Sequence, residues 1–272
     1  MARVRGRSGQ MLWVVAGVII SAAVAALLSF RGLPSSTTER GRPSGSESAY
    51  TLTALPSAFT AQRPLPLIDA TGATRWAPVL HAAAARRAPS FQSAVVARLA
   101  NHTGDGTTNI LVADAAAEHQ GVLWERVRLA VLPNGTQGWV PRSSLGGWTF
   151  VDTRLVIDRA RLTATLLRAG RVVFRAPVAV GAPGTPTPSG QFYVRDRLSG
   201  FSNPMYGPLA FGTNARSPTL TDWPQGGVVG IHGTDRPSLI PGRVSHGCIR
   251  LKNAAIVRLG RLMPVGTPVT IT

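Results

Sequence analysis

The chain has 272 residues, a formal net charge of +17 at pH 7 and 44% hydrophobic residues. Lys252 is the only lysine among the 29 basic residues, and the arginines are scattered, without a basic run interleaved with aromatic residues. The alternative explanation of this charge is codon composition, which can favour arginine over lysine without any functional role. Because the N-terminal segment predicts export, nucleic acid is excluded as a partner, and the remaining polyanions are lipid head groups and wall polymers.

The N-terminus predicts a membrane anchor. Residues 1–10 contain three arginines and no acidic residue, and residues 11–30 carry no charge. An apolar run of this length spans a bilayer, and the positive-inside rule makes residues 1–10 a cytoplasmic tail. Residues 31–60 are expected to be a flexible linker. We therefore predict a single-pass, membrane-anchored protein whose residues after the apolar run are extracytoplasmic. Small residues late in the apolar run leave a cleaved signal peptide as the alternative.

Residues 91–148 predict a small β-domain. Alternation in residues 124–132 indicates a strand, Pro133-Asn134-Gly135 indicates a hairpin turn, and residues 138–141 indicate the returning strand. This run resembles the bacterial SH3-like modules found on wall enzymes, which implies wall binding; a structural spacer is the alternative. The preceding alanine-rich residues 81–87 predict one or two helical turns.

Residues 150–272 again predict a mainly β domain with one helix. A loop rich in proline and glycine is expected at residues 181–190, and a short buried strand at residues 228–231 ends at His232. Asn253 is the expected N-cap of a helix that continues to Met263. The other predicted strands are residues 154–158, 161–168, 171–180, 191–195 and 267–272.

The only cysteine, Cys248, lies in Ser245-His246-Gly247-Cys248-Ile249-Arg250. A lone cysteine in an exported chain has no internal disulfide partner, so its thiol is either buried and inert or free for chemistry. The adjacent glycine and the histidines His246 and His232 favour a nucleophile that has a base nearby. A buried structural thiol and a metal site formed by these three side chains are the alternatives, although the spacing is unusual for zinc.

The motifs Gly230-Ile231-His232-Gly233-Thr234 and Ser245 to Leu251 resemble those of the YkuD-type L,D-transpeptidases. The resemblance extends to the motifs that begin at Thr187, Asn203 and Val265. It implies that residues 150–272 form a YkuD-like, mixed-strand β-sandwich or barrel catalytic domain that acts on peptidoglycan stem peptides. It implies no metal and no cofactor.

The same resemblance implies roles for individual residues. Cys248 would be the nucleophile, His232 the base, and the carbonyl of Gly233 the group that fixes the imidazole tautomer. Backbone N–H groups of Gly247 and Cys248 would form most of the oxyanion hole, and His246 would line the site. The residues implied to bind substrate are Ser245, Arg250, Asn203 and Tyr206.

A cysteine and a histidine suffice chemically for acyl transfer, but they do not determine whether water or an amine resolves the acyl-enzyme. The resemblance implies release of D-Ala from a tetrapeptide donor, followed by attack of a diamino-acid amine from an acceptor stem, which gives a 3→3 cross-link. The alternatives are a cysteine-dependent L,D-carboxypeptidase or endopeptidase of the cell wall, and a non-catalytic wall-binding protein.

Overall fold

The computed structural model describes residues 65–66, 73–220 and 227–272. The predicted cytoplasmic tail, anchor and linker, residues 1–60, lie outside the described residues. Within the described ranges, no helix is both long enough and apolar enough to cross a membrane.

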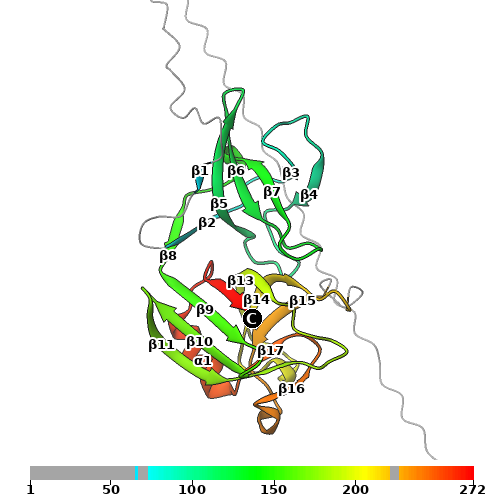
Figure 1. The fold of residues 1–272 in the computed structure, drawn as a ribbon, viewed down its shortest axis with the longest axis vertical. Coiled ribbons are helices and arrows are strands. Elements are labelled where there is room, and N and C mark those ends of the chain that lie inside the picture. Colours follow the sequence, from blue (N-terminus) through cyan, green and yellow to red (C-terminus); the bar gives the residue numbers. More distant parts are fainter. Residues whose placement is uncertain (1–64, 67–72, 221–226) are drawn as a thin grey trace, which may run out of the picture. The chain divides into compact units, whose positions relative to one another are not determined.

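The first part of the described chain is a barrel-like sheet of eight strands (Figure 1). Its main strand order is β4-β3-β7-β6-β5-β2-β8, and β1 pairs with β5. The strands are β1 (Leu65–Pro66), β2 (Thr74–Pro78), β3 (Ala83–Arg86), β4 (Val95–Leu99), β5 (Ile110–His119), β6 (Val122–Arg128), β7 (Gln137–Pro141) and β8 (Thr149–Val151).

The predicted hairpin is confirmed, because β6 and β7 pair antiparallel with Arg128 opposite Gln137. The helical turns expected at residues 81–87 are wrong. Ala83–Arg86 is strand β3, which pairs with both β4 and β7. Ala85 is fully buried there, since pairing and burial outweigh the intrinsic helix preference of alanine. The sheet also begins before the predicted range of residues 91–148, because β2 and β3 complete it.

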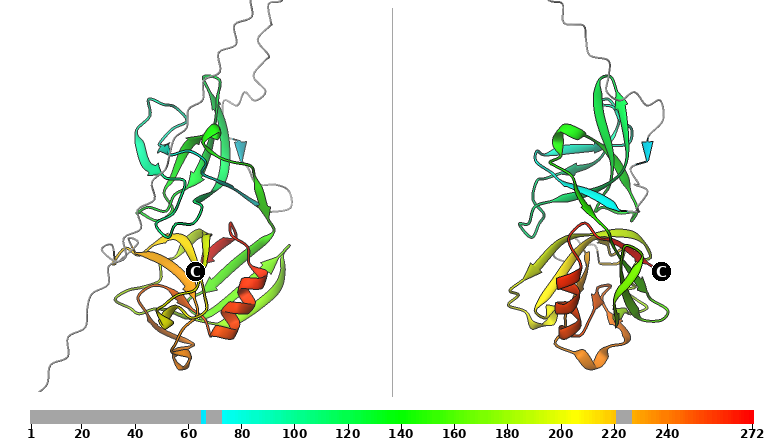
Figure 2. Two further views of the ribbon diagram at one scale, coloured as in Figure 1. Left: turned by 180° about the vertical axis from the view of Figure 1, so that it is seen from behind. Right: turned by 90° about the vertical axis from the view of Figure 1, so that its left-hand side faces the viewer.

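The second part is a ten-stranded mixed sheet, ordered β11-β10-β9-β18-β13-β14-β15-β17-β12-β16. The strands are β9 (Thr153–Asp158), β10 (Thr163–Arg168), β11 (Arg171–Pro177), β12 (Ala179–Gly181), β13 (Gly190–Ser199), β14 (Leu209–Arg216), β15 (Val228–His232), β16 (Gly242–Ser245), β17 (Ile249–Arg250) and β18 (Pro268–Ile271). The single α-helix of the described residues, α1 (Asn253–Leu262), contacts β11 and β14 (Figure 2).

The core of this second part is built from the inward faces of the strands and one face of α1. Ile256 and Leu259 of α1 are fully buried, and Met263 just after the helix is 2% exposed, as the helical spacing predicts. Ile231 of β15 and Ile249 of β17 belong to the same core. The buried core therefore anchors the two short strands on which the site is built.

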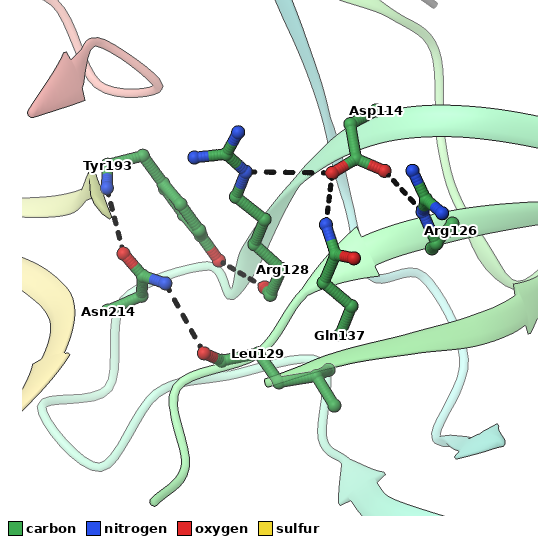
Figure 3. Close-up of polar contacts among 7 residues, drawn as sticks. All are labelled: Asp114, Arg126, Arg128, Leu129, Gln137, Tyr193 and Asn214. Carbon is green, nitrogen blue, oxygen red and sulfur yellow. Dashed lines mark hydrogen bonds and ion pairs between the residues drawn. The ribbon is translucent and has the colours of Figure 1, made fainter. Parts of the chain in front are cut away.

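Polar contacts join the barrel to the ten-stranded sheet (Figure 3). The hydroxyl of Tyr193 is placed to donate to two carbonyl oxygens, that of Ile110 at 3.1 Å and that of Arg128 at 3.3 Å. Asn214 accepts from the backbone N–H of Tyr193 at 2.8 Å and donates to the carbonyl of Leu129 at 3.3 Å. Because Tyr193 is 1% exposed, these bonds are shielded from competing water.

Candidate active site

The register of two parallel strands brings the predicted nucleophile and base to one face. In the β15–β17 pair, Ile231 lies opposite Ile249 and His232 lies opposite Arg250. Side chains alternate along a strand, so the two isoleucines point into the core while His232, Arg250 and Cys248 point to the other face. The parallel pairing thus joins motifs that are separated in sequence.

Gly230 lies between the two reactive side chains. A methyl group at this glycine would be 3.9 Å from Cys248 Sγ and 3.8 Å from His232 Cδ2, so both groups border the same space. The backbone N–H of Gly230 also donates to Cys248 Sγ at 3.4 Å. This bond favours negative charge on sulfur, and the sequence pattern did not reveal it.

His232 is held as a neutral base with one tautomer. Its Nδ1 lies 2.6 Å from the carbonyl oxygen of Gly233, which can only accept, so Nδ1 carries the proton and Nε2 keeps its lone pair. Burial lowers the pKa of His232 to about 4, with a smaller lowering by Arg250 and an opposing effect of the Gly233 bond. The ring of Tyr206 packs edge-on against the His232 ring at a centroid distance of 5.1 Å. The contact between His232 Nδ1 and the carbonyl of Gly233 is the one that the resemblance implies.

The thiol is also neutral at rest. Burial raises the pKa of Cys248, while the N–H of Gly230 and the charge of Arg250 act in the opposite direction. Since the imidazole has a low pKa and the thiol a high one, the ground state is the neutral pair. Deprotonation of sulfur by His232 must therefore accompany attack on a carbonyl carbon.

Ser245 organises the turn that carries the nucleophile. Its hydroxyl donates to the carbonyl of Cys248 at 2.6 Å and accepts from the N–H of Gly247 at 3.1 Å, and the residue is 1% exposed. Gly247 has a φ of +109°, which only glycine adopts without strain. The structure therefore argues against the expected substrate contact of Ser245. The Ser245 hydroxyl also accepts from the N–H of Gly247, which is one of the two expected donors of the oxyanion hole. The N–H of Cys248 remains a predicted donor to the oxyanion.

Two threonines of the proline-rich loop brace the same turn. Thr187 is buried, accepts from the N–H of Gly181 and donates to the carbonyl of Gly247, both at 2.8 Å. Thr185 donates to the carbonyl of Ser245 at 3.0 Å. The motif beginning at Thr187 was part of the family resemblance, but the hydroxyl contacts required the tertiary structure.

Asn253 does not cap α1, because the N-cap position is Lys252 and no side chain bonds there. Its Oδ1 instead accepts from the N–H of Thr234 at 2.9 Å. A Cβ at Gly233 or Gly207 would lie 2.4 Å or 2.5 Å from this oxygen, so both glycines leave it room. Asn253 thus fixes the segment whose carbonyl orients His232, and the helix-cap prediction is wrong because a tertiary partner takes the side chain.

We expect Asn253→Ala to lower the rate of Cys248 acylation about tenfold, because the carbonyl of Gly233 loses its support. Asn253→Asp keeps an oxygen acceptor at this position and is expected to restore most of the rate. Stopped-flow acylation with matched thermal unfolding curves measures both variants. Equal losses in the two variants would contradict a positioning role.

A pocket of about 320 Å³ opens over the reactive pair. Cys248, His232, Arg250, His246 and Tyr206 line it, and much of the remaining wall is apolar. The Nε atom of Arg250 is buried without a hydrogen-bond partner among the described residues, so this guanidinium has donor capacity left for a ligand.

Asn203 does not line this pocket. It is exposed, and its Oδ1 accepts from the N–H of Met205 at 3.0 Å, which caps the short 3-10 helix Pro204–Tyr206. The structure therefore gives Asn203 a role in holding Tyr206 at the pocket wall, in place of the expected substrate contact. As for the metal alternative, no group of three or more His, Cys, Asp or Glu side chains in the described ranges is arranged to hold an ion.

This geometry is that of a cysteine acyl-transfer enzyme, in which an imidazole of fixed tautomer serves a lone thiol. Comparison with known proteins agrees with this class. The model of the family YkuD, L,D-transpeptidase catalytic domain, matches residues 152–271.

Two relatives from Bacillus subtilis (strain 168), both named provisionally as L,D-transpeptidases, are similar to the chain. YkuD is 38% identical over 121 residues, which cover 44% of this chain and 66% of the relative. YqjB is 36% identical over 129 residues, which cover 44% and 72%. The chain belongs to the family of YkuD-type L,D-transpeptidases.

Among solved structures, the crystal structure of an Enterococcus faecium L,D-transpeptidase C442S mutant is similar over 44% of this chain and 50% of that chain. The identity is 24% and the TM-score is 0.36. The chain spans about two thirds of the length of the curated relatives and half of this solved chain.

Proposed function

We propose that the protein is a peptidoglycan L,D-transpeptidase that forms 3→3 cross-links through a thioester on Cys248, with release of D-Ala. The observation that carries the proposal is the proximity of Cys248 and His232, whose side chains border the same space at Gly230. The family assignment supplies the class of substrate.

In the first step, Cys248 Sγ attacks the carbonyl carbon of the donor residue that precedes the terminal D-Ala. His232 Nε2 takes the thiol proton as the C–S bond forms, and the carbonyl oxygen becomes an oxyanion. The C–N bond then breaks, and the imidazolium returns the proton to the leaving amine. One imidazole thus serves as base and then as acid.

In the second step, the side-chain amine of an acceptor stem attacks the thioester carbonyl. His232 takes a proton from this amine, the C–S bond breaks, and the thiolate leaves and regains the proton. The N–H of Gly230, which donates to Sγ, stabilises sulfur as it becomes negative. The N–H of Cys248 is proposed to hold the oxyanion in both steps.

Arg250 is proposed to bind the carboxylate of the terminal D-Ala. Its position opposite His232 in the strand register, its place in the pocket wall and its unused buried Nε support this role. Guanidinium groups recognise carboxylates through paired hydrogen bonds. Tyr206 and His246 are proposed to contact the rest of the donor stem as walls of the pocket.

Incubation of the full chain with a tetrapeptide stem that carries a free side-chain amine tests the proposal. Mass spectrometry should detect a cross-linked dimer that lacks one D-Ala. A tripeptide without any dimer would instead show a carboxypeptidase, and an unchanged tetrapeptide would show that the proposed donor is wrong.

We further propose that the barrel is an SH3-like module that binds the wall, and that residues 11–30 anchor the enzyme with its catalytic domain outside the membrane. The confirmed hairpin supports the first proposal, and the uncharged run after three arginines supports the second. Cell fractionation of the full chain, with and without residues 1–30, tests the anchor.

A further inference from the structure

A loop of the barrel contributes to the active-site pocket. Asp105, between β4 and β5, lines the same pocket as Cys248 and His232, although it precedes the catalytic domain in sequence. Its loop is ordered by its own backbone: Thr103 N–H donates to the carbonyl of Thr107 at 2.8 Å, and Gly106 N–H donates to the carbonyl of Thr103 at 3.0 Å.

The loop is also tied to the ten-stranded sheet. The side chain of Thr107 lies near Asp196 on β13 and acts to lower the pKa of that carboxyl, against the larger raising effect of burial. The guanidinium of Arg195 lies 3.4 Å from Asn109 Oδ1. Both contacts follow Asp105 by two to four residues, so they tie the C-terminal end of its loop to β13.

A second clamp strengthens this attachment. Asn134, in the β6–β7 hairpin turn, donates to the carbonyl of Arg216 at 2.7 Å and accepts from the N–H of the same residue at 2.9 Å. The Nε of Arg216 donates to the carbonyl of Ala130 at 2.9 Å. Because two elements of the barrel are bonded to the catalytic strands, the barrel presents Asp105 as part of the site.

The pocket wall carries two side chains of opposite charge, Asp105 and Arg250. Asp105 is the only acidic side chain among the described residues that line it, and its carboxylate is exposed. Arg250 also lines the pocket, and it lies opposite His232 in the register of β15 and β17. Arg216 is a charged neighbour of Asp105, and its Nε donates to the carbonyl of Ala130. A ligand with one cationic and one anionic group matches this pocket.

We infer that Asp105 binds the side-chain ammonium group of the donor stem's diamino acid. The inference rests on the proposed function, in which the donor's diamino acid supplies the carbonyl that Cys248 attacks. The side-chain amine of this diamino acid does not react in that step and stays protonated at neutral pH. Binding the donor between Asp105 and Arg250 would orient the reacting carbonyl.

The acceptor amine fits this carboxylate less well. It must lose a proton before it attacks the thioester, whereas a neighbouring carboxylate stabilises the protonated form. The donor ammonium is therefore the occupant that the chemistry favours.

The test combines an enzyme variant with a modified donor. Acylation of Cys248 in the full chain is measured by rapid-quench mass spectrometry, using one tetrapeptide with a free side-chain amine and one with that amine acetylated. Asp105→Asn should lower the second-order acylation rate about fivefold with the free amine and leave the rate with the acetylated peptide unchanged. Asp152→Asn, which removes an exposed carboxylate paired with Arg168 outside the pocket, is the charge-matched control.

Equal acylation rates of wild type and Asp105→Asn with the free-amine peptide would overturn the inference while leaving the proposed function intact. An equal loss with both peptides would also overturn it, because the loss would then be independent of the ammonium group. A defect confined to transfer onto the acceptor would overturn the donor assignment. Absence of any acyl-enzyme in wild type would overturn the proposed function and the inference together.

Discussion

Replacement of Cys248 by alanine is expected to abolish acylation, with a loss of turnover of about 10⁴-fold or more. This residue carries the only thiol of the chain, and no other nucleophile is assigned in the pocket that contains His232. Cys248→Ser keeps the shape of the side chain but replaces the thiol by a hydroxyl of much higher pKa. Its turnover should therefore also be lower than that of wild type by several orders of magnitude.

Mass spectrometry of the intact chain after exposure to a carbapenem measures this result, since the family is expected to accept such acylating agents. Wild type should gain one adduct that maps to Cys248, and Cys248→Ala should gain none. An adduct on another residue, or turnover that survives in the alanine variant, would refute the assigned nucleophile.

Replacement of His232 by glutamine is expected to lower acylation about 10³- to 10⁴-fold, because glutamine cannot carry the thiol proton. The raised pKa of Cys248 makes this loss large, since little thiolate forms at neutral pH without a base. His119→Gln, on an exposed histidine at the end of β5, is the matched control and should leave the rate unchanged. A wild-type rate in His232→Gln would show that another group deprotonates sulfur.

The pH dependence of acylation follows from the same pair. The base must be unprotonated, and burial lowers the pKa of His232 to about 4, so activity should persist below pH 6 and fall only as pH drops through about 4. Loss of protonated thiol should limit the neutral pair only above the usual range of a cysteine, because the pKa of Cys248 is raised. A profile of kcat/KM with its acid limb near pH 6.5 would contradict this protonation state.

Local patterns predicted much of the fold. The hairpin at Pro133-Asn134-Gly135 and the apolar face of α1 followed from turn chemistry and helical spacing, which depend on near neighbours in sequence. The alanine run at Ala83–Arg86 shows the limit of such local patterns, because its helix preference is local whereas its pairing with β4 and β7 is not.

The sequence by itself determined the chemical identity of the site: a lone Cys248, a histidine at the end of a buried strand, and motifs that identify the family. Only the tertiary structure decided how these groups are supported. It turned Ser245 and Asn203 to internal hydrogen bonds and gave Asn253 a partner in the loop after His232.

The tertiary structure also brought Asp105 to the pocket from the barrel. The physical reason for this division is range. Nucleophile and base are chosen by residue type, which the sequence displays directly. Hydrogen-bond partners and pocket walls arise from approach between distant segments, which strand register and packing determine.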